Sequence, residues 1–179
     1  MKYIDPRFHY NNKLGLDKAY ASKSGTHVED GVMYIAGTRN VRDLYDDFTK
    51  LPFGLTKHAQ RYKDAEQVLK DNPQVTQLVG HSLASSVSDE LRKQHSGKKL
   101  ELKALYGSPF IDWGSKQHEN RFRHKFDPVS ILDRGAQTVD LGLVNPLKAH
   151  AYDQYTTGHH NKVQASQSKI RRAAPELEL

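Results

Sequence analysis

The sequence predicts an α/β fold in which a mostly parallel central sheet carries helices on both faces. A compact apolar run, Val32-Met33-Tyr34-Ile35-Ala36, lies between glycines and is typical of a strand buried on both faces. After it, helical periodicity and short apolar runs alternate along the chain. Strands that alternate with helices favour right-handed crossovers and parallel pairing.

The first half of the chain predicts two helices and one strand. A short helix is expected over residues 14–24, within a peripheral N-terminal segment (residues 1–25) that packs at the edge of the sheet. The run over residues 31–36 is expected to be a central strand. Apolar residues then recur at spacings of three and four and predict an amphipathic helix that Asn72-Pro73 closes. These positions are Leu55, Ala59, Tyr62, Ala65 and Leu69.

The second half predicts further strands around one helix. The β-branched alternation over residues 75–79 indicates a strand, and helix formers follow over residues 85–95. Gly97 ends that helix, and residues 100–106 predict the next strand. Two more strands are expected over residues 121–126 and 138–144. One domain is expected over residues 1–155, followed by a polar tail over residues 156–179 whose end is mobile.

The composition restricts the class of protein. A chain of 179 residues has room for one core. Its mean hydropathy of -0.78 predicts a soluble protein, and no apolar run approaches the roughly 18 residues that span a bilayer. The start of the chain lacks the apolar segment of a signal peptide, which suits an intracellular or a virus- or phage-borne protein. The absence of cysteine excludes disulfides, thiolate zinc sites and cysteine nucleophiles.

The formal charge of +6 favours anionic partners such as a membrane surface. The basic residues are scattered, however, and Lys98-Lys99 and Arg171-Arg172 are the tightest pairs. This pattern favours plain solubility, or peripheral contact with an anionic membrane, over a nucleic-acid interface.

The motif Gly80-His81-Ser82-Leu83-Ala84 lies between a predicted strand and a predicted helix. A sharp strand-to-helix turn exposes the central serine, and the residues two positions away must be small because strand and helix approach closely there. Gly80 and Ala84 meet this requirement. The motif therefore predicts Ser82 as a nucleophile, with an inert serine in an ordinary turn as the alternative.

A serine nucleophile needs a histidine to accept its proton and usually a carboxylate to orient that histidine. In α/β hydrolases the carboxylate follows the serine along the chain and the histidine comes last. Asp127 meets this order, because Pro128 ends the preceding predicted strand and fixes the turn. His150 meets it on a loop after the last predicted strand.

Other residues compete for these two roles. Asp112 lies early in its loop, and Asp133 precedes Arg134 and is expected to be paired on the surface. His159 and His160 lie in the polar tail, where they would bind a metal only with further ligands nearby.

Acyl transfer also requires N–H donors for the developing oxyanion. The backbone of Leu83, directly after the nucleophile, is the first expected donor. Thr38 is the second, because Gly37 lets the chain turn closely after the strand over residues 31–36. A helix N-cap is the alternative role for Thr38.

Four segments taken together resemble the class 3 lipase family of α/β hydrolases in order and spacing, over residues 31–155. They are Tyr34-Ile35-Ala36-Gly37-Thr38, Leu78-Val79-Gly80-His81-Ser82-Leu83-Ala84, Tyr106-Gly107-Ser108-Pro109 and Phe126-Asp127-Pro128-Val129. The resemblance implies a compact α/β hydrolase with Ser82 as nucleophile and Asp127 and His150 as its partners. It also implies that Thr38 and Leu83 form the oxyanion hole.

The chain departs from the family pattern in two respects. Ala84 stands where the family usually has glycine, and the chain is shorter than typical members, so edge strands are expected to be reduced. The family's lid follows the oxyanion strand. Residues 39–54, which are rich in apolar and aromatic side chains, take that place here. They predict a lid, with ordinary core packing as the alternative.

The sequence therefore predicts a serine esterase or lipase that hydrolyses carboxylic esters of acylglycerols or phospholipids through an acyl-serine. The substrate is a lipid or small ester, and the mechanism requires no metal or organic cofactor. One alternative is a catalytically silent hydrolase-fold module that binds anionic polymer or membrane through its basic surface. Another is an acyltransferase or thioesterase with the same triad, because pocket shape rather than the triad selects the acceptor.

Overall fold

The computed structural model describes residues 6–38, 55–109, 118–130, 133–139 and 150–151. Within them, one six-stranded sheet has the order β1-β2-β3-β4-β5-β6. The first two strands pair antiparallel and all other neighbours pair parallel. The helices are α1 (Pro6–Ala21), α3 (Leu55–Asp71) and α4 (Leu83–Gln94). The strands are β1 (Thr26–Glu29), β2 (Val32–Ile35), β3 (Gln77–His81), β4 (Glu101–Tyr106), β5 (His118–His124) and β6 (Ala136–Val139).

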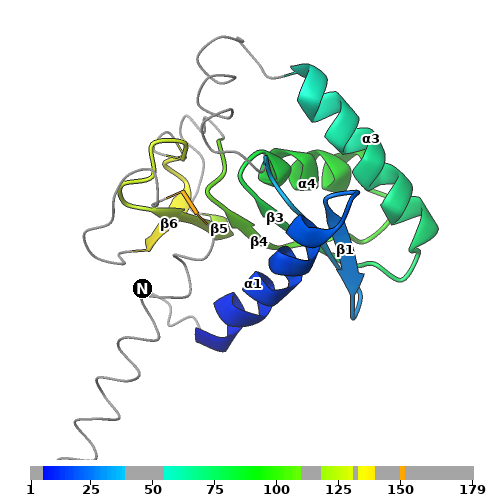
Figure 1. The fold of residues 1–179 in the computed structure, drawn as a ribbon, viewed down its shortest axis with the longest axis horizontal. Coiled ribbons are helices and arrows are strands. Elements are labelled where there is room, and N and C mark those ends of the chain that lie inside the picture. Colours follow the sequence, from blue (N-terminus) through cyan, green and yellow to red (C-terminus); the bar gives the residue numbers. More distant parts are fainter. Residues whose placement is uncertain (1–5, 39–54, 110–117, 131–132, 140–149, 152–179) are drawn as a thin grey trace, which may run out of the picture.

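Helices cover both faces of this sheet, as the sequence predicted. Figure 1 shows α1 on one side of the strands, with α3 and α4 together on the other. Successive side chains of a strand point to opposite faces, so β2 divides its residues between two cores. Val32 and Tyr34 pack with α1, whereas Met33 and Ile35 pack with α3 and α4. The predicted strand over residues 31–36 is therefore buried on both faces, as expected.

The first helix is longer than predicted and belongs to the core. It begins at Pro6, and Leu16 and Ala19 are fully buried against the sheet. The sequence suggested only residues 14–24 because the first half of the buried face is polar. His9 and Asn12 lie one helical repeat earlier on that face and bond to the hydroxyl of Tyr106 at 2.9 and 3.1 Å. A polar stripe of this kind carries no apolar periodicity.

The hairpin of β1 and β2 was not predicted. Asp30 and Gly31 connect the two strands, and both have positive φ, 49° and 74°. An Asp-Gly pair between strands is a strong signal for a tight hairpin turn, because aspartate and glycine tolerate that backbone region. β1 thus adds an antiparallel edge strand to the otherwise parallel sheet.

The remaining elements match the predictions with shifted ends. α3 covers the expected amphipathic helix, and its residues Ala65 and Leu69 are buried. β5 ends at His124 rather than at residue 126, and β6 begins at Ala136. The predicted continuation of that strand to residue 144, and the tail from residue 156, lie outside the described residues. No helix in the described ranges is long and apolar enough to cross a bilayer.

Gly80 marks the closest approach of β3 and α4 and supports a stability prediction. A Cβ atom on Gly80 would lie 2.7 Å from both the Ala84 carbonyl oxygen and the Ser88 hydroxyl oxygen. Gly80→Ala should therefore lower the free energy of unfolding by about 1–3 kcal/mol through overpacking. In urea unfolding, the control Gly97→Ala, where a Cβ meets nothing within 4 Å, should stay within about 1 kcal/mol of wild type. Equal midpoints for the two variants would contradict the close contact.

Candidate active site

Ser82 occupies a strained position between β3 and α4. Its backbone angles are φ 58° and ψ -130°, and in the described part of the chain only Asp30 is another non-glycine residue with positive φ. Such a conformation costs on the order of 1–3 kcal/mol and persists only where the surroundings enforce it. The turn is tight, and the backbone N–H of Ser85 donates to the Ser82 carbonyl at 2.9 Å. The tight, strained turn that the small-residue motif predicted at Ser82 is therefore present.

The structure brings Asp127 and His150 together. His150 Nδ1 lies 3.0 and 2.9 Å from the two Asp127 carboxylate oxygens, and both residues are buried. Because a carboxylate only accepts, Nδ1 carries the hydrogen and donates it. In the neutral ring, Nε2 is then free of hydrogen and can accept a proton. This is the tautomer that a general base needs.

The Asp127 carboxylate is held by further donors. The Val129 backbone N–H donates to Oδ1 at 2.9 Å, and the Ser130 hydroxyl donates to Oδ2 at 2.5 Å. Burial by itself raises the pKa of Asp127, but the hydrogen bonds from His150, Ser130 and Val129 outweigh it, so the pKa lies below its usual value. Asp127 therefore stays ionised where His150 would act.

Ser82 Oγ and His150 Nε2 are both buried and have no hydrogen-bond partner among the described residues. Contacts of the residues around them show that the two atoms lie in the same region of the molecule. The His81 ring, next to Ser82 in the chain, lies 5.1 Å from the His150 ring. Gly107, at the end of β4, faces His150, and a Cβ there would lie 3.0 Å from the His150 Cε1 atom and 3.2 Å from Asp127 Oδ2. The His150 ring thus lies near the turn that carries Ser82, but the structure shows no hydrogen bond between His150 Nε2 and Ser82 Oγ.

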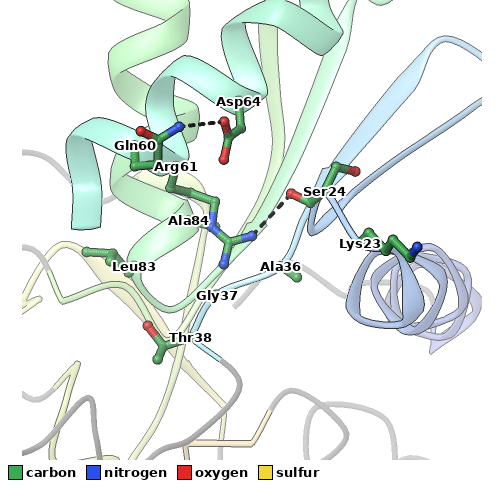
Figure 2. Close-up of a pocket in the computed structure, with 10 residues that line it drawn as sticks. All are labelled: Lys23, Ser24, Ala36, Gly37, Thr38, Gln60, Arg61, Asp64, Leu83 and Ala84. Atoms are coloured by element: carbon green, nitrogen blue, oxygen red, sulfur yellow. Dashed lines mark hydrogen bonds between the residues drawn. The ribbon is translucent and has the colours of Figure 1, made fainter. Parts of the chain in front are cut away.

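Thr38 and Leu83, the predicted oxyanion donors, line the same cavity of about 360 Å³ (Figure 2). The segment before Thr38 also approaches the serine, since a Cβ on Gly37 would lie 2.8 Å from the Ser82 Cβ. On the α3 side of the cavity, Arg61 extends toward the loop between α1 and β1 and donates to the Ser24 carbonyl at 3.4 Å. Both predicted donor residues therefore line one cavity, whereas Ser82, Asp127 and His150 are not among its described lining residues.

Several residues at the site were not singled out from the sequence. Ser130 supports the carboxylate, and His81 and Tyr20 form a hydrogen bond of 2.6 Å beside the serine. Ser130 had a weak signal, three residues after Asp127 in a predicted turn. His81 stood inside the motif, whereas nothing local in the sequence marked Tyr20.

The competing residues have other positions. Asp133 is paired, as expected, but with Arg121 at 3.0 Å and in the interior rather than with a neighbour on the surface. The buried guanidinium of Arg121 on β5 accounts for the difference. Asp112, His159, His160 and the predicted lid over residues 39–54 lie outside the described residues. Across the described ranges, no group of three or more histidine, aspartate or glutamate side chains could hold a metal ion.

Comparison with protein-family models, with curated proteins and with solved structures finds no match to this chain. The assignment of a function therefore depends on the geometry of the site and on the motifs in the sequence.

The hydrogen bonds of the ionised Asp127 carboxylate predict that the stability difference between wild type and Asp127→Asn depends on pH. Because the folded-state pKa of Asp127 is lowered, its ionised form stabilises the fold above the unfolded-state value of about 3.9. That contribution disappears as the pH falls through the folded-state pKa. Asp127→Asn should therefore be less stable than wild type at neutral pH, and the difference should shrink below about pH 4.

Urea unfolding from neutral pH to about pH 3 measures this difference. The exposed Asp71→Asn is the control and should stay within about 0.5 kcal/mol of wild type. A difference for Asp127→Asn that is constant over the whole range would contradict an ionised, hydrogen-bonded carboxylate.

Proposed function

We propose that the chain is a serine hydrolase with an α/β-hydrolase fold, acting on carboxylic esters of acylglycerols or phospholipids through an acyl-serine. The main support is the strained turn at Ser82 near the buried His150–Asp127 hydrogen bond, where Ser82 Oγ and His150 Nε2 are both buried and bond neither to each other nor to another described residue. A buried polar group without a partner costs about 1–3 kcal/mol. Two such atoms beside a strained turn have a physical reason if one is a nucleophile and the other its base.

The proposed reaction has two halves. In the first, Ser82 Oγ attacks the ester carbonyl carbon while His150 Nε2 takes the hydroxyl proton, and ionised Asp127 stabilises the resulting imidazolium. The tetrahedral intermediate collapses when the C–O bond to the alcohol breaks, and His150 returns the proton to the leaving oxygen. In the second half, His150 takes a proton from water as the water oxygen attacks the acyl carbon. The bond from that carbon to Ser82 Oγ then breaks, and His150 returns the proton to Oγ as the acid leaves.

In both halves of the reaction, hydrogen-bond donors must stabilise the negative charge that develops on the carbonyl oxygen. The backbone N–H groups of Leu83, at the start of α4, and of Thr38 are the proposed donors, and both residues line the cavity. Preorganised donors of this kind lower the barrier because they do not reorient during the reaction. A cavity of about 360 Å³ lies within the range of small-molecule sites. The lipid nature of the substrate rests on the resemblance of four motifs to class 3 lipases.

Removal of the nucleophile tests the proposal directly. Ser82→Ala should lower turnover of short-chain p-nitrophenyl esters and of phospholipid vesicles by about a thousandfold or more, leaving the residual effect of binding and oxyanion donors. Ser86→Ala, a serine one turn along α4, is the matched control and should retain wild-type turnover. Near-full activity of Ser82→Ala would contradict the mechanism. Wild-type protein inactive on every ester would favour a silent binding module.

Removal of the base gives a second test. A fluorophosphonate reacts only with an activated serine, so His150→Ala should abolish labelling of Ser82 while His95→Ala leaves it unchanged. His95 serves as the control because it lies at the opposite end of α4 from the Ser82 turn, where it pairs with Glu66 at 3.2 Å. Labelling that is equal in the two variants would place the base elsewhere. Intact-protein mass spectrometry measures the extent of labelling.

A further inference from the structure

A short hydrogen-bond chain connects three parts of the proposed site. The Gly37 backbone N–H donates to the Tyr20 hydroxyl oxygen at 3.1 Å. That hydroxyl lies 2.6 Å from His81 Nδ1, and His81 Nε2 lies 2.8 Å from the His150 carbonyl oxygen. The chain therefore runs from the strand end before Thr38, through α1 and the serine turn, to the backbone of the proposed base.

The groups at the two ends of this hydrogen-bond chain, the His150 carbonyl and the Gly37 N–H, fix the position of each hydrogen within it. A carbonyl oxygen only accepts, so His81 Nε2 must carry a hydrogen and donate it to His150. In a neutral His81, Nδ1 then carries no hydrogen and must accept one from the Tyr20 hydroxyl. Tyr20 has its oxygen available to accept from Gly37, whose N–H only donates. One arrangement of hydrogens satisfies all three contacts.

Neither side chain changes charge near neutral pH. Burial lowers the pKa of His81 to about 3, with the nearby His150 adding to the effect. Burial also raises the pKa of Tyr20 to about 12, against smaller opposing effects of the Gly37 hydrogen bond and Arg61. His81 therefore stays neutral, and Tyr20 keeps its proton, over the range in which a histidine base works. These hydrogen bonds of Tyr20 and His81 therefore persist over this pH range, because neither side chain gains or loses a proton.

We infer that Tyr20 and His81 are positioning residues, which hold the backbone of His150 and the strand end at Gly37 in place around Ser82. This inference rests on the proposed function. The N–H of Gly37 is committed to Tyr20, so the oxyanion donor on this strand end is the next peptide N–H, that of Thr38.

Tyr20→Phe tests the role of the hydroxyl in catalysis. Its loss removes the hydrogen bonds that the hydroxyl makes with Gly37 N–H and His81 Nδ1 and lets the groups around Ser82 shift. Because small misplacements of reacting groups slow the chemical step, kcat should fall roughly 10- to 100-fold with KM changed less than about threefold. The fluorophosphonate labelling rate of Ser82 should fall in parallel.

Tyr106→Phe is the matched control. Its hydroxyl is also buried and bonded, to His9 and Asn12 on α1, whereas Tyr106 contacts the serine turn through its backbone carbonyl, which the substitution keeps. It should lower the unfolding midpoint as much as Tyr20→Phe while kcat stays within about twofold of wild type. If the two variants lose activity equally, or neither does, the positioning role is wrong.

Conservative replacement of His81 separates positioning from packing. The side-chain amide of His81→Gln can still donate to the His150 carbonyl, whereas His81→Leu keeps bulk and donates nothing. His81→Gln should therefore retain a kcat at least roughly fivefold above that of His81→Leu, the equivalent of one hydrogen bond. Equal kcat values for these variants would contradict the inference.

The tautomer of His81 provides a readout that needs no enzymatic activity. ¹⁵N NMR of wild-type protein should show His81 protonated at Nε2 only, without change between pH 5 and 9, and Tyr20→Phe should alter the Nδ1 signal. A hydrogen on Nδ1, or titration of His81 within this range, would overturn the inference. If the predicted tautomer is found but Ser82→Ala keeps full esterase activity, the proposed function fails while the hydrogen-bond chain stands.

Discussion

Burial of an ionised carboxylate at the end of β5 is the constraint on which the site depends. A charge removed from water must be paired and hydrogen-bonded, or it becomes protonated. Asp127 meets this requirement with a backbone N–H from Val129, the Ser130 hydroxyl and His150 Nδ1. The first two come from its own turn. The third brings a residue from 23 positions away and fixes both the orientation and the tautomer of its ring.

The parallel sheet explains why these groups meet. The carboxyl ends of parallel strands lie along one edge, and the groups of the site follow the strand order there. Gly37 and Thr38 follow β2, Ser82 follows β3, Gly107 follows β4 and Asp127 follows β5. Ser82 therefore lies between the segment proposed to supply an oxyanion donor and the segments that hold His150. The strain at Ser82 is supported by its position between β3 and α4, since both pack in the buried core formed by Leu78, Ala84 and Val87.

The parts of this arrangement that local chemistry dictates could be predicted from the sequence. Gly80 and Ala84 predicted the tight turn at Ser82, and Pro128 marked the turn that carries Asp127. Contacts between distant residues gave no local signal. Asp133, expected to be paired on the surface, instead forms a buried ion pair with Arg121, and Tyr20 bonds to His81 across 61 positions of the chain. The start of α1 was missed because His9 and Asn12 put polar atoms on its buried face.

Detection of the acyl-enzyme would test the central claim most directly. Protein mixed with a p-nitrophenyl ester and quenched in acid within the first turnovers should carry one acyl group, as an early burst of p-nitrophenol would also indicate. Peptide mapping by mass spectrometry should locate that group on Ser82, and His150→Ala should not accumulate it. Hydrolysis without an adduct, or an adduct on another side chain, would contradict the account.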